Sequence, residues 1–258
     1  MSKSMKINTD AFTYREVDGS GLLSLGDKAL EIATNFELKE QLFECLHRVE
    51  QSRSLTGLVI LNTHEYHGDE RYFEFLDTIM GTESETRHLS GMLSGRYGNS
   101  INQITIRLAE MTKPIIMGMS GLITSEQLGI SLPCDFRIAT PDVAFTFRSL
   151  GQGYPPNGAL VFYMLNTIGP TKTAELLYST ESLSVERAVE LGLVTRIVPE
   201  TELESACLAQ MAELAKLPAE AVAATRKMLQ PDIAGLARFL ERSLESSRAA
   251  LVSMKSIR

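Results

Sequence analysis

The sequence predicts an α/β protein with a partly parallel sheet and a helical C-terminal part. In roughly the first 150 residues, short apolar runs typical of buried strands alternate with helical patterns. Glycine and proline residues separate these segments, and after Pro156 the patterns become almost entirely helical. Strand and helix alternating at this spacing indicate βαβ units. A chain of 258 residues is long enough for one large domain, or for one domain with a smaller appendage.

The predicted strands are compact runs of apolar residues bounded by turn-forming residues. Continuous runs of this kind are typical of strands buried on both faces. They lie at residues 21–25 (GLLSL), 56–61 (TGLVIL), 115–119 (IIMGM), 136–139 (FRIA), 144–147 (AFTF) and 194–198 (VTRIV).

The predicted helices show apolar residues at spacings of three and four, as in Leu38, Leu42, Leu46 and Val49. Pro114 ends one of them, because proline cannot continue a helix. The helices lie at residues 36–51, 97–111, 125–132, 158–168, 171–178 and 184–191, with a tail at 200–216, 218–229 and 233–254. A tail so rich in alanine and leucine must cover either its own core or a neighbouring subunit.

Composition excludes several classes of protein. Hydrophobic residues make up 44% and charged residues 22%, which is typical of a globular chain rather than a disordered one. The net charge of −7 and the lack of a Lys/Arg cluster argue against nucleic acid and anionic membranes as partners. The N-terminus has no secretory signal pattern and no run of 18 apolar residues occurs, so we expect a cytoplasmic protein.

The cysteine and histidine patterns predict neither a disulfide framework nor a metal site. Cys45, Cys134 and Cys207 are widely spaced and odd in number, which predicts reduced, buried thiols. His64 and His67 stand three residues apart, but no third ligand accompanies them, so we expect no metal site.

Several longer motifs carry a family resemblance. They are KPIIMGMSG (113–121), CDFRIAT (134–140), VAFTF (143–147), SVERAVELGLVTRIVPE (184–200), TGLVILNT (56–63) and PAEAVAATRKML (218–229). In these stretches the chain resembles the crotonase superfamily, which includes the enoyl-CoA hydratase/isomerase family. The resemblance implies a ClpP/crotonase-like spiral of ββα units in a core domain at residues 1–200. It also implies a C-terminal helical trimerisation segment at residues 201–258.

The resemblance also implies a substrate and a way of activating it. The substrate is an acyl thioester of coenzyme A or of phosphopantetheine on an acyl carrier protein, no cofactor is bound permanently, and the assembly is a homotrimer or hexamer. Two backbone N–H groups form an oxyanion hole for the thioester carbonyl, as preorganised donors stabilise an enolate. The matching positions are Gly68 or Asp69 for the first donor and Glu126 for the second. A Glu126 side chain either turns away from the pocket or serves as an acid or base.

The chain departs from the family pattern at both hydratase glutamates. Gly129 and Ser149 stand at those positions. Hydration needs one carboxylate to activate water and another group to protonate carbon, so the departure disfavours it, and it also disfavours an ordinary double-bond shift. The resemblance then leaves three possibilities. They are a decarboxylase, hydrolase or other specialised lyase; a non-catalytic binding or scaffold protein; and a hydratase/isomerase that uses another carboxylate, such as Glu126 or Asp69.

Other side chains are weighed as proton donors or substrate contacts. His67 stands beside the first oxyanion loop and has an ordinary pKa suited to acid–base work, although a surface turn also explains it. Tyr154 and Tyr72 offer hydroxyl groups, but packing against the pocket wall is the favoured interpretation of each, and Tyr154 is the better candidate of the two. Arg148 and Ser149 lie on the segment that resembles the family's active-site strand end.

The thioester's carrier arm would meet a different set of residues. By resemblance, Lys28 and Ala29 lie near the adenosine part of coenzyme A, and Lys227 lies on a helix that faces it. The family's usual Asn-Ala pair is absent at positions 28 and 29. A carrier-protein pantetheine arm needs fewer of these contacts.

Overall fold

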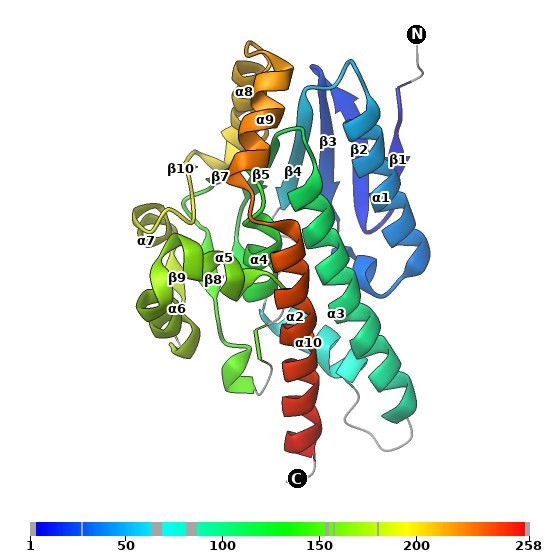
Figure 1. Cartoon of the computed structure of the whole chain (residues 1–258), viewed down its shortest axis with the longest axis vertical. Coiled ribbons are helices and arrows are strands. Elements are labelled where there is room, and N and C mark those ends of the chain that lie inside the picture. Colours follow the sequence, from blue (N-terminus) through cyan, green and yellow to red (C-terminus); the bar gives the residue numbers. More distant parts are fainter. Residues whose placement is uncertain are drawn as a thin grey trace.

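The architecture is given by a computed structural model. It describes residues 4–26, 28–62, 69–80, 87–152, 155–156, 158–179 and 181–255, without the side chains of 69, 80, 87–94, 152 and 251–255. Within this part of the chain, strands and helices alternate up to about residue 200 and helices follow (Figure 1). The predicted α/β class is confirmed.

The strands form two sheets. The larger sheet has the order β1-β2-β3-β4-β5-β7-β10, and the smaller one has the order β6-β8-β9. Pairing is parallel from β3 through β10 and antiparallel at β1–β2 and β2–β3. The strands are β1 (Ile7–Asn8), β2 (Phe12–Val17), β3 (Ser20–Leu25), β4 (Gly57–Asn62), β5 (Ile115–Met119), β6 (Leu122–Thr124), β7 (Phe136–Ala139), β8 (Ala144–Thr146), β9 (Leu183–Ser184) and β10 (Arg196–Ile197).

The helices surround the sheets and supply the connections between parallel strands. They are α1 (Phe36–Gln51), α2 (Asp69–Met80), α3 (Arg87–Glu110), α4 (Ser125–Ser131), α5 (Leu160–Thr167), α6 (Gly169–Tyr178), α7 (Val185–Glu190), α8 (Leu203–Leu214), α9 (Ala219–Leu229) and α10 (Ile233–Lys255). Short 3₁₀ helices are η1 (Ala29–Ala33), η3 (Leu150–Gln152) and η4 (Glu200–Glu202). No helix in the described segments is both long and apolar enough to cross a membrane.

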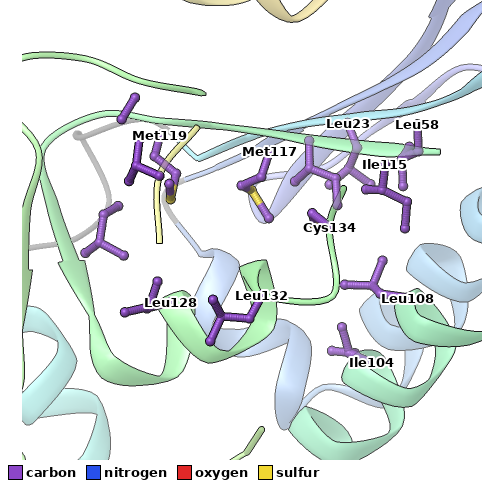
Figure 2. Packing of buried hydrophobic residues seen from close by; sticks show 14 of the residues in the cluster. Leu23, Leu58, Ile104, Leu108, Ile115, Met117, Met119, Leu128, Leu132 and Cys134 are labelled. Carbon is purple, nitrogen blue, oxygen red and sulfur yellow. The ribbon is translucent and has the colours of Figure 1, made fainter. Parts of the chain in front are cut away.

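Both faces of the larger sheet are buried, which explains the continuous apolar runs of its central strands. On one face, β4 and β5 side chains pack against α1, α3 and α4; Figure 2 shows Leu58 and Ile115 on the side of Leu108, and Met119 on the side of Leu128. On the other face, a separate cluster packs against α8. Because successive side chains of a strand point to opposite faces, one strand serves both cores.

The C-terminal helices cover the protein's own core. Leu203, Cys207 and Met211 of α8 lie against the sheet, and they are 5%, 0% and 1% exposed. Helix α10 runs beside α3, where Leu236 and Leu240 are buried (Figure 1). A domain boundary at residue 200 and a trimer contact through 201–258 stay predictions.

The structure also contains elements that the sequence patterns did not predict. These are the strands β1, β2, β6 and β9 and the helix α2. The two-residue strands β1 and β9 are too short to show a pattern of their own. No helix is predicted at α2, although Tyr72, Leu76 and Ile79 follow helical spacing. In the structure these three side chains are 3%, 2% and 3% exposed. Its apolar side packs against α3 and η1 in a third cluster.

Candidate functional site

The candidate site is built around the first turn of α4. Gly121, with φ of 72°, makes the turn between β5 and β6, and β6 then leads directly into the helix. Thr124 is the N-cap: its Oγ1 accepts from the Gln127 backbone N–H, while Gln127 Oε1 accepts from the Thr124 backbone N–H at 2.8 Å. This reciprocal capping box fixes the helix start. It therefore also fixes where Ser125 and Glu126 point.

Glu126 lines an apolar cavity of about 110 Å³ and is only 4% exposed. The cavity lies among β3, β4, β5, η1 and helices α1 to α4. Its described lining contains no Lys, Arg or His. The lining residues are Leu23, Leu25, Ala29, Leu30, Ile32, Ala33, Leu42, Leu46, Ile60, Tyr72, Tyr97, Ile101, Ile104, Leu108, Met117, Thr124, Glu126, Gln127 and Ile130.

Two tyrosines from neighbouring helices share this cavity with Glu126. Tyr72 comes from α2 and Tyr97 from α3, and each is 3% exposed. The Tyr72 hydroxyl has no hydrogen-bond partner of good geometry among the described residues, although it is close enough to Glu126 to influence its pKa. A buried polar group without a partner costs about 1–3 kcal/mol. Such a group in a cavity is available to a ligand.

The environment favours the neutral form of all three side chains. Burial raises the pKa of Glu126 above its ordinary value, and the nearby Tyr72 hydroxyl, the Ser125 hydroxyl and the residue's own backbone N–H oppose the rise. Burial, together with the nearby Glu126 carboxylate, also raises the pKa of Tyr72 and of Tyr97. Glu126 is therefore a carboxylic acid whose proton is held more tightly than in water, as suits a group that gives and takes protons near neutral pH.

Ser149 and Ser125 connect to the Glu126 carboxylate. Ser125 Oγ donates to Glu126 Oε2 at 2.8 Å, and the Oγ atoms of Ser125 and Ser149 are 3.4 Å apart. The two serines are 2% and 3% exposed. The structure therefore brings together two residues predicted for the site, Glu126 and Ser149, through a third that was not singled out.

Gly129, which is predicted to stand at the first hydratase position, is closely packed against a neighbouring helix. A Cβ atom on Gly129 would lie 3.0 Å from the backbone nitrogen of Leu160 and 3.2 Å from its Cβ. These contacts are tighter than most real Cβ contacts, so α5 would have to move by a few tenths of an ångström to admit a side chain here. Close packing of α4 against α5 therefore favours glycine at this position.

Several predicted site residues cannot be placed. His67, Gly68 and Tyr154 lie outside the described residues. Asp69 is the first residue of α2, and its side chain is likewise outside the description. The first oxyanion donor, and the convergence of two backbone N–H groups on one point, therefore stay predictions.

The residues predicted to meet the carrier arm fall in different places. Ala29 begins η1 and lines the cavity with Glu126. Lys28 precedes it and pairs with Asp10 at 3.3 Å on the surface. Lys227 is exposed on α9 and is not among the residues of the cavity wall. Arg148 is exposed and borders a separate hollow of about 460 Å³.

Sequence reasoning missed two residues of the site and undervalued a third. Tyr97 and Ser125 were each predicted only as the first residue of a helix. Tyr72 was noted, with wall packing preferred for it. Helical spacing through Tyr72, Leu76 and Ile79 was the available signal, because a helix there turns Tyr72 inward. The position of Ser125 beside Glu126 carried no signal without coordinates.

Comparison with known proteins identifies the family and the fold of the chain. Residues 25–253 match the family model for enoyl-CoA hydratase/isomerase. A trans-2-decenoyl-[acyl-carrier-protein] isomerase of Streptococcus mutans is 24% identical over 155 residues, which are 60% of this chain and 59% of that protein. The chain thus aligns with less than two thirds of this relative's length. A 4-chlorobenzoyl coenzyme A dehalogenase of an Arthrobacter species is 24% identical over 202 residues, covering 78% of this chain and 71% of that protein.

A solved structure shows the same fold. The enoyl-CoA hydratase from Bacillus halodurans superposes with a TM-score of 0.77 at 19% identity, covering 95% of this chain and 96% of that one. The larger sheet, the smaller sheet and the C-terminal helices therefore make up the predicted crotonase fold. The chain belongs to the enoyl-CoA hydratase/isomerase family of the crotonase superfamily.

Proposed function

We propose that the protein is an acyl-thioester enzyme that moves a proton along an uncharged acyl chain, with Glu126 as the acid and base. The observation that carries this proposal is a buried carboxyl group of raised pKa in an apolar cavity. The described lining holds no cation, so a substrate carboxylate placed there would be buried without a partner, at a large cost in free energy. An uncharged acyl chain fits the same walls.

One carboxylate is enough for this chemistry. As an anion, Glu126 takes a proton from one carbon of the acyl chain, which leaves an enolate on the thioester. The same proton then returns from Glu126 to a second carbon, so the double bond shifts and the enzyme is regenerated. Hydration would need a further group to activate water, and a side chain at Gly129, the predicted match of the first hydratase glutamate, would crowd α5.

Of the three functions that the sequence leaves open, this proposal favours the hydratase/isomerase with another carboxylate over the decarboxylase or hydrolase. Decarboxylation and hydrolysis rested on the absence of any carboxylate from the two family positions. The structure supplies a carboxyl group at a third position, so the cavity supports an isomerase with a non-standard carboxylate better. The likeness to a carrier-protein isomerase agrees with this choice and favours testing both coenzyme A and carrier-protein thioesters.

The test is an assay of double-bond shifting on enoyl thioesters of several chain lengths, beside crotonyl-CoA hydration and malonyl-CoA decarboxylation. We expect shifting to be the main activity and Glu126→Gln to reduce kcat by about 10²–10⁴, the usual contribution of a positioned acid or base. Glu186→Gln is the matched control, because Glu186 holds the same position after the N-cap of α7 but is exposed. Full activity in Glu126→Gln would contradict the proposal.

A second function is favoured by one further observation. The Glu126 carboxylate lies close enough to its own backbone N–H to lower its own pKa. By resemblance that N–H is an oxyanion donor, and a carboxylate facing it competes with the thioester carbonyl. A protein of this kind would bind acyl thioesters without turnover. Calorimetry that shows tight binding, with no reaction in any of the three assays, would favour this second function.

A further inference from the structure

Three oxygen atoms form a continuous chain inside the protein. Ser149 Oγ is 3.4 Å from Ser125 Oγ, which is 2.8 Å from Glu126 Oε2. All three residues are at most 4% exposed. The chain links the end of the β8 segment to the cavity wall at α4. Neither serine is needed to cap α4, since Thr124 does that.

Proton counting sets the direction of these hydrogen bonds. An ionised carboxylate can only accept, so Ser125 donates its single hydroxyl proton to Glu126. Ser125 then has no proton left for Ser149 and must accept from it. Both hydroxyl groups therefore point their protons toward Glu126 when that residue is charged, and hydrogen bonds to a charged group are about twice as strong as neutral ones.

We propose that Ser125 and Ser149 are positioning residues that orient the Glu126 carboxylate in the cavity and stabilise its anion. The inference rests on the proposed function, in which Glu126 must be able to ionise. Without the relay, only Tyr72 and the residue's own backbone N–H would oppose the effect of burial, and the anion would become less accessible. Ser149 thus has a role at the position where family members carry a glutamate: it acts on a carboxylate held by another residue.

Few other titratable groups among the described residues would obscure the effect of the two serines on the titration of Glu126. Among the described residues, the titratable side chains whose pKa is linked to the Glu126 carboxyl group are Tyr72 from α2 and Tyr97 from α3. In the same part of the chain α5, β6 and β8 also pack against α4, and they contain no Asp, Glu, Lys, Arg or His. A change in the titration of Glu126 after a serine substitution therefore reports the lost hydroxyl group.

The experiment is a titration of Glu126 in the substrate-free protein, followed by the infrared band of the protonated carboxyl group. The band of Glu126 is the one that disappears in Glu126→Gln. We expect Ser125→Ala to raise the proton affinity of Glu126 by about tenfold or more, the size of one charge-assisted hydrogen bond. Ser149→Ala should shift the titration in the same direction by less. Ser125→Cys, with its weaker donor, should fall between Ser125→Ala and the parent.

The matched control is Ser131→Ala. Ser131 is buried on the same helix, but its hydroxyl donates to the Leu128 carbonyl and does not reach Glu126. An unchanged titration in Ser125→Ala or Ser125→Cys would overturn the relay, and a Ser149→Ala protein that titrates like Ser131→Ala would remove Ser149 from it. Because no substrate is present, these results are independent of the assays that test the proposed function.

Discussion

Arg226 and Glu126 are both ionisable side chains buried in the protein, yet their surroundings are opposite. Arg226 of α9 is 2% exposed and donates to Asp135 Oδ2 at 2.9 Å. It also donates to the backbone carbonyls of Leu108, Ala109, Met111 and Pro133. Glu126 has one well-formed hydrogen bond from a neighbouring side chain and otherwise faces an apolar cavity.

The difference separates a structural polar group from a candidate functional one. All three guanidinium nitrogen atoms of Arg226 donate hydrogen bonds within the protein, so none is left to bind a ligand. These bonds connect α9 to the end of α3 and to the loop after α4. Glu126 is left only partly satisfied, as is its neighbour Tyr72. Groups whose pKa values are perturbed in a cavity are typical of functional sites. Three substitutions would break or sharpen this comparison.

The largest effect should follow from Arg226→Met. The variant removes one donor from each of four carbonyl groups, of which Pro133 keeps Gln230 Nε2 at 2.9 Å, and it leaves Asp135 with the Ile115 backbone N–H at 2.7 Å. Removing one partner of a buried ion pair costs about 3–5 kcal/mol, so the free energy of unfolding, measured with urea, should fall by that amount. Arg238→Met is the control: its pair with Asp232 is exposed and 3.8 Å long, and a change below about 1 kcal/mol is expected. Equal losses in the two variants would refute the structural role of Arg226.

A smaller loss should follow from Gly129→Glu, which restores the family's first glutamate. Because the new Cβ would meet the backbone of Leu160 at 3.0 Å, α5 must move, and overpacking of this kind costs about 1–3 kcal/mol. Crotonyl-CoA hydration should not appear. Gly151→Ala serves as control, since a Cβ there meets nothing within 4 Å. A stable Gly129→Glu protein that hydrates crotonyl-CoA would show that α5 does not hinder a side chain at this position.

The smallest effect, and the most specific, should be a change in pH dependence in Glu126→Gln. Because the pKa of Glu126 is raised in the folded protein, the folded state binds the proton more tightly than the unfolded state does. Stability should therefore fall as pH rises above the ordinary glutamate value, by at most about 1.4 kcal/mol per pH unit. Glu126→Gln should remove this fall and so be stabilised relative to the parent at pH 8 but not at pH 4. The measurement is urea unfolding at a series of pH values.

Glu186→Gln again provides the reference for that measurement, since its exposed carboxylate lies at the same helix position. It should keep the pH dependence of the parent. A parent protein whose stability rises between about pH 3 and pH 5, through the ordinary glutamate pKa, by an amount that Glu126→Gln abolishes would mean that Glu126 is stabilised as an anion. That result would contradict the arrangement described for the cavity.

The sequence by itself determined the strands of the larger sheet that have continuous apolar runs, most of the helices, and membership of the superfamily. Helix 36–51 is an example, since both of its ends were predicted from spacing and polarity and agree with α1. These features are local: they depend on which side chains recur at intervals of two, three or four residues. The same local information predicted Glu126 and Ser149 as site residues, through resemblance of the surrounding motifs.

Only the tertiary structure decided what those residues can do. The sequence separates Tyr72 and Tyr97 from Glu126 by 54 and 29 residues, and α2 and α3 bring them to one cavity. Burial raises the pKa of Glu126, and burial is a property of all the elements around a side chain rather than of its neighbours in sequence. The close packing at Gly129 likewise depends on α5, whose Leu160 is 31 residues away. Local patterns carry no information on such contacts, because packing alone sets the distance between side chains that are remote in the chain.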